Sequence, residues 1–111
     1  MPEKSVKKLL NISKLPDGEL ASILRQGVLL RLPFLEGRLV KAEEEVKRFH
    51  EKYRITLHDI KSQGLPENAD YKMHEDFIEW EYWDDVLSET KTIIRSVKAL
   101  LGKVEGAVDL H

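Results

Sequence analysis

The run Phe34-Leu-Glu-Gly-Arg-Leu-Val-Lys-Ala-Glu-Glu-Glu-Val-Lys-Arg-Phe-His-Glu-Lys-Tyr53 decides the fold class of this 111-residue chain. Its apolar side chains recur at alternating spacings of three and four residues, which places them on one face of an α-helix. These side chains are Leu35, Leu39, Ala42, Val46, Phe49 and Tyr53. The run therefore predicts an amphipathic helix with a heptad seam, and Pro33 suits its first turn.

A second, longer seam follows between about residues 70 and 101. Its members are again three and four residues apart: Trp80, Trp83, Leu87, Thr90, Ile94, Val97, Leu101 and Val104. On one flank, four further apolar residues widen this seam into a stripe that suits a helical bundle. They are Tyr82, Val86, Ile93 and Leu100. Two long helices with a short connection predict an antiparallel hairpin of 34–54 and 70–101. The hairpin domain is expected to extend to residue 104, with 105–111 as a frayed tail.

The connection between the two helices carries the signals of a structured tip. Thr56 suits the N-cap of a short helix, and Asp59 stands at the capping-box position three residues later. Ile55 and Ile60 are placed to form a hydrophobic staple across that cap. Gly64 then ends the short helix.

The N-terminal region, residues 1–33, predicts one further helix over about residues 18–30, capped by Asp17. The expected fold is therefore all-α, a hairpin with an additional N-terminal helix. Because two helices cannot cover so wide an apolar stripe, we expect a homodimer that completes a four-helix bundle. Its core seam is predicted to contain Leu35, Leu39, Val46, Phe49, Tyr53, Leu87, Ile94, Val97 and Leu101.

The composition indicates a soluble, cytoplasmic protein. Charged residues make up 34% of the chain, and Glu and Lys are abundant while side-chain amides are few, as in proteins of thermophiles. The absence of cysteine excludes disulfides and thiolate chemistry. No apolar run reaches the length of a membrane span, so no membrane association is expected. The start, Met1-Pro-Glu-Lys, lacks the apolar core of a signal peptide.

Charge is strongly segregated along the chain. Residues 65–90 carry nine acidic groups and one lysine, a balance of −8, whereas the whole chain carries −2. Both tryptophans lie in this acidic stretch. Carboxylates that pair with Lys or Arg, next to aromatic anchors, suit a surface that binds a basic protein. The predicted partner-binding residues are Glu79, Trp80, Glu81, Tyr82, Trp83, Asp84 and Asp85.

Helical spacing divides this acidic segment between the inside and the outside. Trp80 and Trp83 begin the seam, while the outward positions are expected to be Glu81, Tyr82, Asp84 and Asp85. Two acids, Asp76 and Glu79, fall on the seam side, where Leu or Ile is usual. The predicted register places Arg48 and Arg54 near Asp76 and Asp70. It also places Glu43–Glu45 beside Glu79–Glu81.

Three other interpretations remain open. In the first, the acidic segment is only the acid-rich start of a helix in a dimer core and has a purely structural role. The pairs Asp76-x-x-Glu79 and Glu81-x-x-Asp84 are loosely similar to the Mg²⁺-binding helices of all-α nucleotide pyrophosphohydrolases. The first helix has no matching acidic pair, however, so we predict a non-enzymatic protein with no cofactor and no metal. The third interpretation is nucleic-acid binding by the N-terminal lysines, although four lysines in this region are not a specific signal for it. These lysines are Lys4, Lys7, Lys8 and Lys14.

A family resemblance covers about residues 34–87. It rests on the block Glu36–Tyr53, the segment Ile55-Thr-Leu-His-Asp-Ile60 and, most strongly, the run Glu79-Trp80-Glu81. These segments resemble small prokaryotic helical proteins that are similar to antitoxin components of toxin–antitoxin modules. This chain departs from the pattern with Arg54 where Gly is usual, and with His58-Asp59 where two acids are usual. The resemblance implies a small basic toxin as the partner, bound through Glu79, Trp80 and Glu81.

Overall fold

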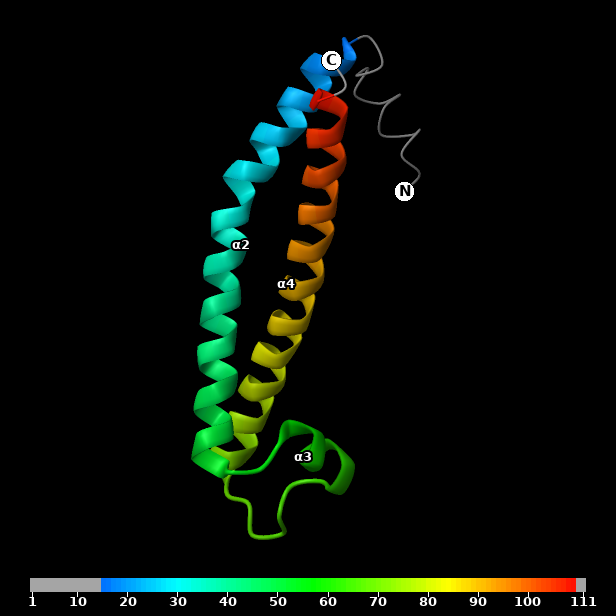
Figure 1. Cartoon of the computed structure of the whole chain (residues 1–111). Coiled ribbons are helices and arrows are strands. Elements are labelled where there is room, and N and C mark those ends of the chain that lie inside the picture. Colours follow the sequence, from blue (N-terminus) through cyan, green and yellow to red (C-terminus); the bar gives the residue numbers. More distant parts are fainter. Residues whose placement is uncertain (1–14, 110–111) are drawn as a thin grey trace. The chain divides into compact units, whose positions relative to one another are not determined.

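The computed structural model describes residues 15–109, and these residues form three helices and no strand. The helices are α2 (Asp17–Tyr53), α3 (Leu57–Gln63) and α4 (Tyr71–Asp109), and Figure 1 shows α2 and α4 as long uninterrupted helices. The all-α class and the helical hairpin are thus confirmed. The chain divides into two compact units. Unit 2 is Phe34–Ile94, and unit 1 comprises the residues on either side of it.

The hydrophobic core of unit 2 lies where α2, α3 and α4 meet. Its fully packed members are Phe49, Leu57, Ile60 and Trp80. Partly buried apolar side chains surround them: Val46, Tyr53, Ile55, Leu65, Phe77 and Trp83. Both helices of the hairpin and the tip therefore contribute to one core, which stabilises α3 although it is only seven residues long.

The heptad seam of α2 is as predicted and extends further than predicted. Ala21, Val28, Leu35, Ala42 and Phe49 are all buried, and each lies seven residues after the one before. The other predicted seam residues of this helix, Leu39, Val46 and Tyr53, are half-buried. On α4 the predicted seam positions are likewise buried or half-buried: Trp80, Trp83, Leu87, Thr90, Ile94, Val97, Leu101 and Val104. The packing role of the predicted seam is confirmed.

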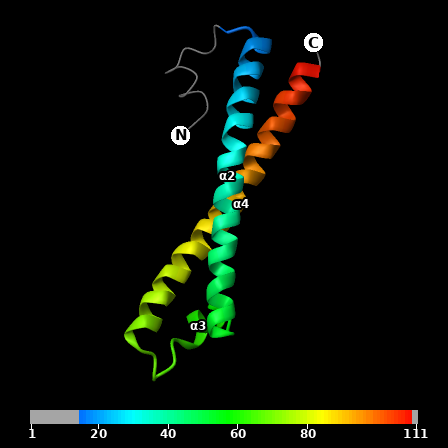
Figure 2. The ribbon, with the colours of Figure 1, turned by 90° about the vertical axis from the view of Figure 1, so that its left-hand side faces the viewer.

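The tip of the hairpin also forms as predicted. The Thr56 hydroxyl accepts a hydrogen bond from the Asp59 N–H at 3.0 Å and caps α3. Ile55 and Ile60 both join the core, as a hydrophobic staple requires. Gly64 follows α3 with φ 81°, a conformation that favours glycine, and its N–H donates to the Ile60 carbonyl. In both views α3 lies beside the joined ends of α2 and α4 (Figures 1 and 2).

Unit 1 contains much less buried apolar surface. Among the side chains described there, only Ala21, Val28 and Val104 are buried. Arg25 and Glu105 form an ion pair at 2.6 Å between α2 and α4. The three buried side chains are small, so this pair of helical segments gains little free energy from its own core.

Two predicted boundaries are wrong. The separate N-terminal helix does not exist, because α2 begins at Asp17 and continues through Pro33 to Tyr53. The regular seam on both sides of Pro33 outweighs the one backbone hydrogen bond that proline removes. The helix α4 also extends to Asp109, five residues beyond the predicted end of the hairpin at residue 104. Gly102 and Gly106 lower helix propensity but do not end the helix, because Leu101 is half-buried and Val104 is buried in the same stretch. The predicted lysine cluster of residues 4–14 lies outside the described residues.

Within residues 15–109, no helix combines the length and the apolar character that a bilayer crossing requires.

Candidate functional site

The two tryptophans of the acidic segment occupy different environments. The Trp80 side chain is only 1% exposed and is stacked between Phe49 and Tyr53, with ring centroids 5.9 Å and 6.2 Å away. Trp83 is half-buried, with the Lys41 ammonium 5.8 Å from its ring centroid. Trp80 is therefore a core residue, as its seam position predicted. Its predicted role as a partner contact is wrong, because α2 already covers its ring.

Asp76 is buried beside this aromatic stack and is held by three side chains. Its Oδ2 accepts hydrogen bonds from the Lys52 ammonium at 2.6 Å and from the Tyr53 hydroxyl. Its Oδ1 lies 3.2 Å from the Lys72 ammonium. The prediction that Asp76 faces the seam is confirmed. Its ion-pair partners are Lys52 and Lys72, whereas Arg48, which was predicted to lie near it, pairs with Glu45 and Glu79. We call the set Asp76, Lys52, Tyr53 and Lys72 the Asp76 cluster.

The Asp76 cluster holds its carboxylate ionised despite burial. Burial alone would raise the pKa of Asp76, but the hydrogen bonds from Lys52, Tyr53 and Lys72 outweigh it and lower the pKa from 3.8 to about 2. The hydrogen bond to Asp76 correspondingly raises the pKa of Lys52. Burial, and then the hydrogen bond to Asp76, raise the pKa of Tyr53. The cluster therefore joins the end of α2 to the start of α4 through a satisfied buried charge.

Arg48 separates carboxylates that were predicted to repel each other. Its guanidinium contacts Glu45 at 2.8 Å on its own helix and Glu79 at 3.6 Å on α4. Glu45 also binds Lys41 at 2.7 Å, and the hydrogen bonds from Lys41 and Arg48 lower the pKa of Glu45. Glu45 and Glu79 therefore lie alongside each other, as predicted, and the Arg48 guanidinium between them offsets the predicted repulsion.

The outer side of α4 carries an exposed row of apolar and acidic side chains. Tyr71, Glu75, Ile78, Tyr82, Asp85 and Glu89 are all exposed, at successive spacings of 4, 3, 4, 3 and 4 residues. This periodicity places them on one face of the helix, and we call them the outer stripe. The side chains of Tyr71, Ile78 and Tyr82 are 77%, 68% and 58% exposed. Tyr82 packs edge-on against Trp83, with ring centroids 5.1 Å apart, which fixes its position.

The acids around the outer stripe are mostly not neutralised by the protein itself. Glu79 pairs with Arg48, and Glu89 lies 4.0 Å from Arg38. In the described part of the chain, no ion pair within 4.0 Å involves Glu75, Glu81, Asp84 or Asp85. Residues 34–94 contain nine basic and fifteen acidic residues, so unit 2 carries a balance of −6. The face thus combines apolar anchors with unpaired negative charge.

The structure separates the predicted partner-binding residues. Tyr82 and Asp85 lie on the outer stripe, whereas Glu81, Trp83 and Asp84 are half-buried and lie elsewhere around the helix. Glu79 is exposed but is engaged by Arg48. The prediction missed Tyr71, Glu75, Ile78 and Glu89. A signal for them was present, because they repeat the heptad spacing on the side of the helix opposite the seam.

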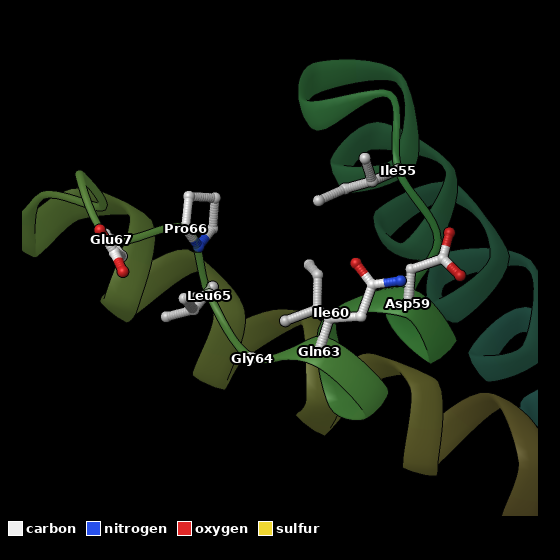
Figure 3. A pocket seen from close by; sticks show the side chains of 8 residues that line it. All are labelled: Ile55, Asp59, Ile60, Gln63, Gly64, Leu65, Pro66 and Glu67. Atoms are coloured by element: carbon white, nitrogen blue, oxygen red, sulfur yellow. The ribbon is translucent and has the colours of Figure 1, made fainter.

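The tip contains a pocket of about 460 Å³, shown in Figure 3. Ile55, Ile60 and Leu65 form its apolar middle, and Asp59 and Glu67 stand at its opposite ends. The two carboxylates do not converge on a common point, as acid–base or metal chemistry requires. Across the described residues, no group of three His, Cys, Asp or Glu side chains is placed to hold a metal ion.

Comparisons of this chain with protein-family models, with curated proteins and with solved structures found no match.

Proposed function

We propose that this chain is a non-enzymatic protein-interaction module whose outer stripe binds a basic partner protein. The observation that carries the proposal is the exposure of Tyr71, Ile78 and Tyr82 on one face of a helix that is rich in unpaired carboxylates. Anchors spaced i, i+7 and i+11 on a helix are the pattern by which helices bind apolar grooves. The carboxylates add electrostatic attraction to a cationic rim around such a groove.

The partner that this face fits has an apolar groove lined by Lys or Arg. A small nuclease-type toxin with a basic RNA-binding surface is one such protein, and the resemblance of residues 34–87 to antitoxin components favours it. In that arrangement the outer stripe would occupy the surface that otherwise holds a phosphate backbone, since both present regularly spaced negative charge. The Asp76 cluster supports the face by fixing the start of α4 on α2.

The proposal is tested by comparing two double variants that change the net charge equally. Glu75→Lys with Asp85→Lys reverses two acids of the outer stripe, whereas Glu43→Lys with Glu44→Lys reverses two exposed acids of α2. Proteins retained from native lysate by each immobilised variant and by the wild type are identified by mass spectrometry. We expect the stripe variant to lose a basic protein that the wild type and the α2 variant both retain.

The apolar anchors provide a second readout with the partner so identified. Ile78→Ala with Tyr82→Ala is expected to weaken its binding at least about 10-fold, because exposed apolar anchors carry much of an interface's affinity. The same pair should change the free energy of unfolding by less than about 1 kcal/mol, because both side chains are exposed. Equal binding by the wild type and both stripe variants would refute the proposal.

A further inference from the structure

The tip of the hairpin carries an apolar pocket with a carboxylate at each end. This pocket of about 460 Å³ lies within unit 2 and is lined by residues between Ile55 and Glu67. We call it the tip pocket. Figure 3 shows its apolar side chains Ile55, Ile60 and Leu65 between Asp59 at one end and Glu67 at the other.

The apolar walls of the tip pocket are fixed before anything binds. Ile60 is 3% exposed and belongs to the hydrophobic core of unit 2, and Ile55 and Leu65 pack against that core as partly buried side chains. Thr56 caps α3 and Gly64 ends it, so both connections that contribute to the pocket are anchored on this short helix. A preformed apolar surface binds a ligand with little ordering of its own side chains.

The protein does not use the two carboxylates of the tip pocket itself. Asp59 and Glu67 are both exposed. Within residues 15–109, neither carboxylate takes part in an ion pair within 4.0 Å or in a side-chain hydrogen bond. Unit 2 as a whole carries a balance of −6. A cationic ligand is therefore attracted to this end of unit 2, and an anionic ligand is repelled.

We infer that the tip pocket binds a peptide segment of another protein in which apolar side chains lie between two basic side chains. The apolar side chains of the segment would cover Ile55, Ile60 and Leu65, and its basic side chains would pair with Asp59 and Glu67. The carboxylates lie at opposite ends of the pocket, so they suit two separate cations along a chain and not a single central one.

The exposed rim of the tip pocket also favours a peptide segment over a small molecule. Gln63, Gly64 and Pro66 line the pocket and are all exposed, so a chain can enter and leave across them. Pockets for small molecules instead enclose most of the surface of their ligand. This inference does not rest on the proposed function, because the tip pocket and the outer stripe share no residue.

Fluorescence anisotropy with labelled synthetic peptides tests the inference on the full chain. The peptides carry Leu residues between two Arg residues about three to five positions apart, which spans roughly 10 to 18 Å of extended chain. We expect at least one of them to bind with a dissociation constant below about 100 µM. Replacing its Arg by Glu, or its Leu by Ser, should weaken binding at least about 10-fold. Failure of every peptide to bind, or equal binding of the Ser peptide, would overturn the inference.

A matched pair of variants tests the two carboxylates. Asp59→Asn with Glu67→Gln removes both charges of the tip pocket and keeps the Asp59 N–H that bonds Thr56. This variant should bind the peptide about 5-fold more weakly at low salt, because two exposed ion pairs are lost. Glu43→Gln with Glu44→Gln makes the same change in net charge on α2 and should bind as the wild type does. Circular dichroism checks that both variants keep their helices, and equal binding by the two would contradict the inference.

The place of binding is tested by nuclear magnetic resonance on the ¹⁵N-labelled protein. Addition of the peptide should shift the amide signals of Gly64, Leu65 and Glu67 and leave those of Ile78 and Tyr82 unchanged. Shifts confined to Ile78 and Tyr82 would place the peptide on the outer stripe. That result would overturn the inference and leave the proposed function intact.

Discussion

A few polar residues inside the hairpin define how its helices align. A seam of Leu and Ile alone would tolerate a shift of α4 along α2 by one heptad, since the spacing repeats. Asp76 removes that freedom, because only the observed register places it beside Lys52 and Tyr53. A buried carboxylate without these donors would cost several kcal/mol. The cluster therefore specifies the register that also brings Arg48 to Glu79.

Asp76→Asn should lower the free energy of unfolding at pH 7 by about 2 kcal/mol, the equivalent of the drop in pKa from 3.8 to about 2. Because the folded-state pKa is depressed, this stability is present above about pH 4. It is lost as the pH falls through about 2. Urea unfolding followed by circular dichroism at pH 7, 4 and 2 should show the gap between wild type and variant closing. Asp85→Asn, on the exposed stripe, serves as control, and a gap independent of pH would contradict the prediction.

Arg54 adopts a backbone conformation that glycine tolerates better. Its φ is 55°, and its N–H donates to the His50 carbonyl at 2.8 Å, closing the end of α2. Glycine is the residue that most often occupies such a left-handed position after a helix. A side chain with a Cβ costs about 1 to 2 kcal/mol in this region.

Arg54→Gly should therefore raise the free energy of unfolding by about 0.5 to 1 kcal/mol, after the greater chain entropy of glycine is subtracted. Thermal unfolding of the purified protein measures the change. Arg54→Ala removes the same charge but keeps the Cβ, so it should not stabilise the protein. A gain of equal size in both variants would show that charge, and not backbone conformation, is responsible.

At the scale of the element, α2 continues through a residue that normally ends a helix. Pro33 lacks the N–H that would bond the carbonyl of Leu29, and its ring crowds that carbonyl. The helix continues because Val28 and Leu35 on either side are both buried. Tertiary packing thus outweighs local propensity over this turn.

Pro33→Ala should raise the free energy of unfolding by about 2 kcal/mol. Proline in a helix interior costs about 3 kcal/mol, and about 1 kcal/mol of that gain is returned because the unfolded chain becomes more flexible. Urea unfolding followed at 222 nm measures the difference. The control is Glu36→Ala, an exposed change in the same helix, for which we expect less than about 0.5 kcal/mol. A neutral or destabilising Pro33→Ala would show that proline is accommodated at no cost.

At the scale of the whole molecule, charge is divided between the two units: residues 34–94 carry −6 and the rest of the sequence carries +4. Unit 2 carries −6 and presents the outer stripe, so its proposed partner is basic.

The sequence by itself determined the helical hairpin and the inward faces of its helices, although not the continuation of α2 through Pro33. Heptad spacing identified the residues that pack, from Leu35 to Phe49 and from Trp80 to Leu101, because burial in a helix follows its 3.6-residue period. The tip was also predictable, since Thr56, Asp59 and Gly64 act through local backbone geometry.

Only the tertiary structure decided which helix positions meet and which acids remain unpaired. A heptad pattern repeats every two turns, so it cannot by itself fix the register between two helices. The contacts of Lys52 with Asp76 and of Arg48 with Glu79 settled that register. In this register Trp80 is buried and part of the acidic charge is paired with Lys and Arg of α2. Tyr71, Ile78 and Tyr82 stay exposed, because a side chain is available to a partner only where the neighbouring helix does not cover it.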